Sequence, residues 1–76
     1  MPKLGPNVWV VRRGAHFSIK EEKTGRFLVP PISRRLAITI ARLIASSNRS
    51  ELIVQDRAGR IQERDSHGSD PFPPRG

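Results

Sequence analysis

The sequence predicts a small α+β domain in which one helix packs on one face of a mostly antiparallel sheet. Short runs of β-branched residues, closed by Gly or Pro, stand on both sides of a single segment with helical periodicity. The chain has 76 residues and no cysteine, so neither disulfides nor thiolate metal sites supplement its core. We therefore expect a single domain that depends on nearly all of its large apolar residues for stability.

Three strands are expected before the helix. Residues 1–7 predict an irregular lead-in, because prolines and a glycine stand too close together there for a regular element. The predicted strands follow at Val8–Val11, His16–Lys20 and Phe27–Val29. Pro30 and Pro31 end the third strand, because proline cannot continue a β-ladder. These strands predict an antiparallel meander.

One helix is expected after Ser33, a residue type that caps helix N-termini. At about 100° per residue, one face is apolar and is predicted to pack on the sheet; it carries Leu36, Ala37, Ile40, Ala41, Leu43 and Ile44. The opposite face carries Arg35, Thr39, Arg42 and Ser46, with Arg34 and Ile38 at its margin. Asn48 is predicted to end the helix in the left-handed conformation.

Two more strands are expected at residues 51–55 and 60–63, joined by a hairpin in which Gly59 needs a positive φ. The predicted order is β-β-β-α-β-β over residues 8–64, followed at 65–76 by a polar turn and an extended Pro-rich tail. A single helix leaves one face of the sheet uncovered. Three occupants of that face stay open: the tail with Phe72, a second copy of the chain, or another partner.

The segment after the helix resembles a known family. The pattern runs Gly59-Arg60-Ile61, Arg64-Asp65-Ser66, Gly68 and Asp70-Pro71-Phe72-Pro73-Pro74, with Gly76 at its end. It is similar to the end of small bacterial proteins classed as domain of unknown function two thousand one hundred and eighty-eight. His67 stands where that family is expected to have an aromatic residue, and Ser33-Arg34-Arg35-Leu36 makes the helix more basic. The resemblance implies a bacterial or phage-carried module of this fold without an assigned activity.

Positive charge is the unusual feature of the composition. The chain has 14 Lys and Arg against 7 Asp and Glu, a net charge of +7. Between Glu22 and Glu51 there is no acidic residue, so most of the excess lies in this window. Arg binds phosphates through a planar fork, and a basic domain favours a polyanionic partner. Arg-rich composition is also typical of GC-rich genomes, and the sequence does not separate the two explanations.

The leading functional hypothesis is a non-catalytic module that contacts a polyanion, most plausibly nucleic acid, through the basic helix face. Arginines seven residues apart form a ladder along one side of a helix. The candidate contacts are Arg35, Arg42 and Arg49, extended by Arg34, Arg26 and Lys23. The alternative is an ordinary solvated helix face onto which acids from elsewhere in the fold turn back. Few aromatics accompany the charge, so base stacking is not expected.

The second hypothesis is a protein-interaction module, either a homodimer or an accessory factor that docks on a larger protein. Here the uncovered sheet face makes the contact, through Trp9, Val11 and Phe72. The strand with Trp9 is interpreted equally well as a free edge or as an internal strand.

No catalytic, cofactor or metal site is predicted. The segment from Asp65 to Asp70 contains Ser, His and Asp, but neighbours along one segment rarely converge as a triad does, so it indicates a polar turn. Asp65, His67 and Asp70 lack the spacing of metal ligands. No apolar run has the length of a signal peptide or a membrane span. We therefore expect a cytoplasmic protein without a membrane partner.

Overall fold

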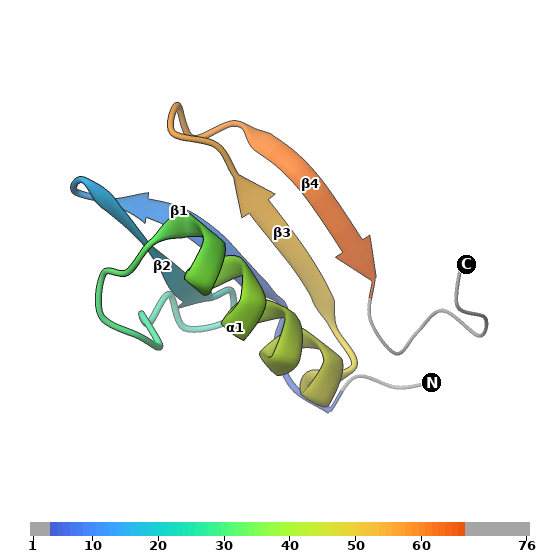
Figure 1. Ribbon diagram of the computed structural model, residues 1–76. Helices are drawn as coiled ribbons and strands as arrows, with labels where there is room; N and C mark the ends of the chain where they lie inside the picture. The colour runs from blue at the N-terminus through green and yellow to red at the C-terminus, as the bar shows by residue number, and fades with distance from the viewer. Residues whose placement is uncertain (1–3, 67–76) are drawn as a thin grey trace.

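The computed structural model describes residues 4–66, which form four strands and one helix (Figure 1). In chain order the elements are β1 (Val8–Arg13), β2 (His16–Glu21), α1 (Arg34–Asn48), β3 (Glu51–Gln55) and β4 (Ile61–Ser66). The strands form one sheet in the order β2-β1-β3-β4. The predicted α+β class, with one helix on a mostly antiparallel sheet, is confirmed.

Two hairpins meet at the centre of this sheet. β1 and β2 pair antiparallel, as do β3 and β4, whereas β1 and β3 pair in parallel. Val8 lies beside Glu21 on one side and beside Leu52 on the other. The strand that carries Trp9 is therefore internal, and the outer strands of the sheet are β2 and β4.

The predicted third strand at 27–29 is not a strand. Phe27 forms an isolated bridge with Lys20, and Ile32 forms another with Phe17. Between these points the Ser18 hydroxyl donates a hydrogen bond to the carbonyl of Val29, at 2.6 Å. Pro30 and Pro31 have no N–H to donate, so a continuous ladder cannot form along this segment. Residues 26–32 therefore follow the edge of β2 and touch it at separate points.

The helix packs on the sheet through a stripe of alanines. Three alanines of the helix are fully buried and form the core with side chains from β2, β1 and β3. The alanines are Ala37, Ala41 and Ala45. The strand side chains are Val8, Val10, Phe17, Ile19, Leu52 and Val54. Figure 1 shows α1 across β2 and β1 and beside β3, while β4 lies beyond the helix.

The predicted packing face of the helix is wrong at two positions. Leu36 and Leu43 are 47% and 69% exposed, and Ile38, placed at the outer margin, packs against the core instead. The helix is turned by about a quarter turn from the predicted orientation. Alanine side chains let the helix backbone approach the sheet closely, so the alanine stripe takes the centre and the larger side chains flank it.

The N-terminal end of the helix is as predicted, and the C-terminal end is not. Ser33 is the N-cap as predicted, because its hydroxyl accepts a hydrogen bond from the N–H of Leu36 at 3.2 Å. The left-handed residue, however, is Arg49, with φ of 52°, and not Asn48. Asn48 stays in the helix and holds the lead-in: its carbonyl accepts from the N–H of Leu4 and Gly5, and its side chain donates to the carbonyl of Pro6. This anchors residues 4–6 to the end of the helix.

Two further features bear on the predicted organisation. Gly59, in the hairpin between β3 and β4, has a φ of 84°, as predicted. Within residues 4–66, no helix combines the length and apolarity needed to cross a membrane.

Candidate functional site

The arginine side of α1 turns toward β4, the strand that the helix does not cover. Arg42 forms an ion pair with Glu63 across this gap, with 3.7 Å between Nη2 and Oε2. Arg34 donates a hydrogen bond from Nη2 to the side-chain oxygen of Gln62. Glu63 thus turns back onto the helix, and its carboxylate compensates the charge of Arg42, one of the three arginines predicted to form a ladder.

The other two members of the ladder differ from each other. Arg35 is exposed, and its side chain has no ion pair or hydrogen bond with any residue of the described part of the chain. Arg49 takes the left-handed cap position, where its N–H bonds to the carbonyl of Ser46, and it has a further interaction within the structure. Of the three, Arg35 is the one best placed to meet an outside anion.

Lys23 and Arg26 belong to a different surface. They follow β2, where the carbonyl of Arg26 accepts the N–H of Glu21. β2 and β4 form opposite edges of the sheet. The six predicted polyanion contacts therefore do not lie together: four are on the helix and its C-cap, and two are on the far edge.

The structure brings Arg34, a predicted contact, together with two arginines that sequence reasoning missed, Arg12 and Arg57. Arg34 and Arg57, from the start of α1 and the β3–β4 turn, lie over the ring of Phe17, and Arg12, from the end of β1, is bonded to Arg57; we call these three the arginine cluster. The Cζ atoms of Arg34 and Arg57 lie 5.8 and 6.0 Å from the ring centre. Arg12 stands opposite Phe17 in the strand register and donates from Nη1 to the carbonyl of Arg57 at 3.2 Å.

The arginine cluster has little compensation from acids. No carboxylate of residues 4–66 lies within ion-pair distance of its three members. Asp56 is close enough for the charge of Arg34 to act on it, but its carboxylate accepts the N–H of Arg60 and Ala58 and pairs with the Arg60 side chain. The hydrogen bond from the N–H of Arg60, then that from Ala58, and then the charges of Arg60 and Arg34 lower the pKa of Asp56. The carboxylate of Asp56 is therefore engaged within the turn.

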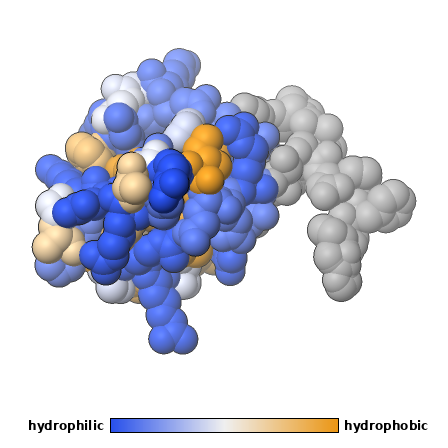
Figure 2. Space-filling model, turned by 90° about the horizontal axis from the view of Figure 1, so that it is seen from above, coloured by the Kyte–Doolittle hydropathy of each residue, from blue (hydrophilic) through white to orange (hydrophobic). Residues whose placement is uncertain are grey.

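The side of the molecule on which the β3–β4 turn lies is polar. Figure 2 looks down on the molecule from above, the side where Figure 1 places the β3–β4 turn. Hydrophilic side chains cover most of this side, and the apolar ones stand singly among them. This side of the molecule therefore exposes no broad apolar patch.

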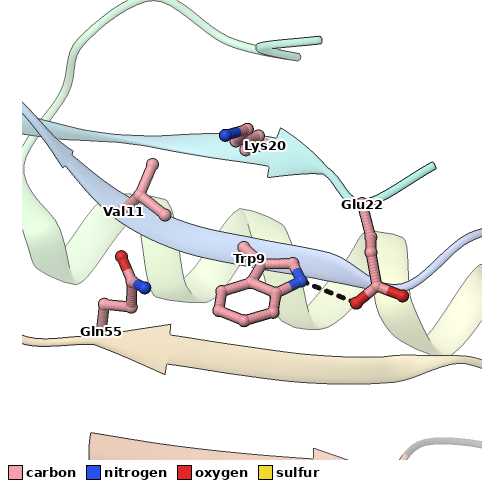
Figure 3. Close-up of a pocket in the computed structure, with 5 residues that line it drawn as sticks. All are labelled: Trp9, Val11, Lys20, Glu22 and Gln55. Carbon is pink, nitrogen blue, oxygen red and sulfur yellow. Dashed lines mark hydrogen bonds between the residues drawn. The ribbon is translucent and has the colours of Figure 1, made fainter. Parts of the chain in front are cut away.

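The sheet face opposite the helix carries a second feature, a hollow beside Trp9 (Figure 3). It has a volume of about 250 Å³ and is lined by Trp9, Val11, Lys20, Glu22 and Gln55. The Trp9 indole donates from Nε1 to Oε1 of Glu22 at 2.8 Å, and Asn7 donates to the other oxygen at 3.1 Å. These bonds fix the ring across β1. Of the predicted interface residues, Trp9 and Val11 meet here, and Phe72 lies outside the described residues.

Residues with metal-binding side chains do not gather in the described part. No group of three or more His, Cys, Asp or Glu side chains that could hold a metal occurs within residues 4–66. Of the predicted polar turn, Asp65 and Ser66 are described and form the end of β4. Its other Ser, His and Asp residues, from position 67 onward, fall outside the described residues.

The sequence that forms these elements matches a known family. The family described as "Uncharacterized protein conserved in bacteria (DUF2188)" matches residues 7–67. The chain belongs to this family. No curated protein and no solved structure matches it. The matched range spans all four strands and the helix, so the fold above is that of a DUF2188 domain in this chain.

The DUF2188 domain thus offers two surfaces of different chemistry. The arginine cluster, with Arg35 beside it on the helix, concentrates positive charge where three elements meet. The hollow on the opposite face offers one fixed aromatic ring bordered by a single charge of each sign. The first suits a multiply charged anion, and the second suits a small apolar group.

Proposed function

We propose that this DUF2188 domain is a non-catalytic module of the bacterial cytoplasm that binds nucleic acid through the phosphate backbone. The arginine cluster and Arg35 make the contact. The observation that carries the proposal is the convergence of Arg12, Arg34 and Arg57 from three elements, with no carboxylate of residues 4–66 at ion-pair distance.

Like charges that converge in this way repel one another, and the helix adds to the repulsion. The first turn of α1 contains no acidic residue and begins with Arg34 and Arg35, so two cations stand at the positive end of the helix dipole. A phosphate bound among these guanidinium groups relieves the repulsion and accepts paired N–H donors. Folding alone does not require this arrangement, which supports a role in anion binding.

The cluster favours backbone contacts over base contacts. Phe17, the aromatic ring beside it, is 2% exposed because it belongs to the hydrophobic core, and Arg34 and Arg57 lie over its ring. The ring is therefore inaccessible to a base, and stacking does not contribute. We expect binding that tolerates changes in nucleic-acid sequence and weakens steeply as salt rises, because each neutralised phosphate releases counterions.

A structural role for the same arginines makes a different prediction. If they only cover Phe17, their loss lowers the free energy of unfolding and no anion binds. Arg57→Gln tests this, because Arg57 lies in a turn and its side chain makes no hydrogen bond within residues 4–66. Arg26→Gln is the matched control, since it removes the same charge from the opposite edge of the sheet.

The test is a titration with labelled duplex and single-stranded DNA and RNA at low and moderate salt. We expect Arg57→Gln and Arg35→Gln each to weaken binding by about 1 kcal/mol and to lower the salt slope by about 1, with little effect of Arg26→Gln. Arg42→Gln is expected to have a smaller effect than Arg35→Gln, because Glu63 already pairs with it. Absence of binding at low salt, or equal losses in Arg57→Gln and Arg26→Gln, would refute the proposal.

The hollow beside Trp9 favours a second candidate function, protein interaction through the open sheet face. A partner protein or a second copy would then pack on Trp9 and Val11. This function requires the hollow to be vacant in the free chain.

A further inference from the structure

The arginine cluster connects the β3–β4 turn with the start of α1. Figure 1 shows both at the same end of the molecule, with the turn standing out beyond the helix. Arg57 comes from the turn and Arg34 from the helix, and their Cζ atoms lie 6.0 and 5.8 Å from the centre of the Phe17 ring. Positive charge is therefore concentrated between the turn and the first residues of the helix.

We propose that the nucleic acid is duplex DNA and that the β3–β4 turn enters its major groove. This inference rests on the proposed function, and it names the kind of nucleic acid that the arginine cluster binds. One strand of the DNA backbone crosses the cluster between the turn and the helix. The turn then lies in the groove beside that strand.

The β3–β4 turn has the size and shape that a groove requires. It joins two antiparallel strands, and a two-stranded ribbon fits the major groove of B-DNA, which is about 12 Å wide, better than the minor groove of about 6 Å. The tip of the turn consists of Ala58 and Gly59, which are both exposed, and nothing lies within 4 Å of a Cβ added at Gly59. Such small residues let the backbone of the turn approach the floor of the groove closely.

Hydrogen bonds fix the turn before any ligand binds. The carboxylate of Asp56 accepts the N–H of Ala58 at 2.9 Å and that of Arg60 at 3.0 Å, and the N–H of Asp56 donates to the carbonyl of Arg60 at 2.8 Å. The guanidinium of Arg12 donates to the carbonyl of Arg57 at 3.2 Å, which ties the turn to β1. A turn held in this way loses little conformational entropy on binding.

The side chains of the turn suit phosphates and not base edges. Arg60 is 81% exposed, and its Nε lies 3.6 Å from the carboxylate of Asp56, so this exposed ion pair is weak and Arg60 adds a cation beside the cluster. Ala58 and Gly59 have no side-chain donor or acceptor with which to distinguish one base pair from another. The turn therefore enters the groove without selecting a sequence.

The other forms of nucleic acid fit the site less well. Single strands are bound largely by stacking of their bases on aromatic rings, and the ring beside the cluster, Phe17, is 2% exposed. Duplex RNA has a deep and narrow major groove that side chains cannot read. Duplex DNA offers both an open groove to the turn and regularly spaced phosphates to the arginines.

The experiment compares a DNA duplex, an RNA duplex of the same sequence and length, and a single DNA strand of that length, at one low salt concentration. We expect the unchanged chain to bind the DNA duplex about tenfold more tightly than either of the others, which is the effect of about one lost contact.

A variant at the tip of the turn tests entry into the groove. Ala58→Leu adds bulk without a change of charge, so it should weaken binding of the DNA duplex several-fold and leave binding of the single strand unchanged. Ala15→Leu is the matched control, because Ala15 is an exposed residue in the turn between β1 and β2. It should bind the DNA duplex like the unchanged chain. Circular dichroism and urea unfolding of both variants separate loss of binding from loss of the fold.

Two results would overturn the inference and leave the proposed function in place. The first is binding of the RNA duplex or the single strand as tight as that of the DNA duplex, weakened in each case by Arg57→Gln. The second is equal binding of the DNA duplex by Ala58→Leu and Ala15→Leu, which would mean that the turn stays outside the groove. If none of the three nucleic acids binds at low salt, the proposed function fails, and the inference fails with it.

Discussion

The two faces of the sheet are built for different purposes. On the helix side, Val10, Ile19, Leu52 and Val54 are fully buried against the alanines of α1. On the open side, the largest side chain is a partly exposed tryptophan whose position depends on a carboxylate. The comparison teaches that the helix face supplies stability by close packing, while the open face holds one aromatic ring in a fixed and accessible position.

The largest expected effect tests whether the helix face holds the domain together. Leu52→Ala removes a fully buried side chain and should lower the free energy of unfolding by about 2–5 kcal/mol. Leu43 is 69% exposed on the helix, so Leu43→Ala should change the free energy of unfolding by about 0.5 kcal/mol or less. Urea unfolding measures both. Equal losses in the two variants would mean that the helix packs through the face predicted from periodicity and not through the alanines.

A smaller effect is expected on the open face. Trp9→Phe keeps an aromatic ring but removes the N–H that binds Glu22, so we expect a loss of about 1 kcal/mol in the free energy of unfolding. The loss stays below that of Leu52→Ala because this face is only partly buried. Urea unfolding again provides the measurement. A loss as large as that of Leu52→Ala would contradict the division between the two faces.

The smallest effect concerns the turn that joins β3 to β4. The pKa of Asp56 is lowered, mainly by the backbone hydrogen bond from Arg60, so its contribution to stability is fully present above the ordinary carboxyl pKa and is lost as pH falls through the lowered value. NMR titration of the Asp56 carboxyl should give a midpoint below that of an unfolded peptide. Asp56→Asn retains an acceptor for the two N–H groups and should remove this acid dependence while largely preserving the turn, whereas Asp56→Ala removes both. An unshifted midpoint would show that the turn does not hold the carboxylate.

Local signals predicted much of the fold. Ser33 as N-cap, Gly59 at positive φ and four of the five predicted strands follow from residues close together in sequence, and the structure confirms them, whereas residues 27–29 do not form the predicted strand. The parallel pairing of β1 with β3 was not predicted, because no local pattern encodes which distant strands become neighbours. Helical periodicity also placed Leu36 and Leu43 on the buried face, although both are exposed. A hydrophobic pattern gives leucine more weight than alanine, whereas the smaller alanine side chain lets the helix approach the sheet more closely.

The candidate sites were less predictable than the fold. The basic window of the sequence contains Arg34 and Arg35, but Arg12 and Arg57 lie outside it and join them only through the β1–β2 register and the β3–β4 turn. The same window includes Lys23 and Arg26, which the fold places on the opposite edge. Trp9 as an interface residue stays a prediction; its fixed position depends on Glu22, which no local pattern indicated.

The parallel pair at the centre of the sheet also has a consequence for how the chain folds. Each hairpin closes between residues near in sequence and can form within microseconds, but a two-stranded hairpin is marginal alone. The hairpins unite only when Val8 meets Leu52, after the helix has closed the long loop between them. We therefore expect this late, non-local step to limit the folding rate and to make the whole domain fold and unfold in one transition, with neither hairpin persisting alone.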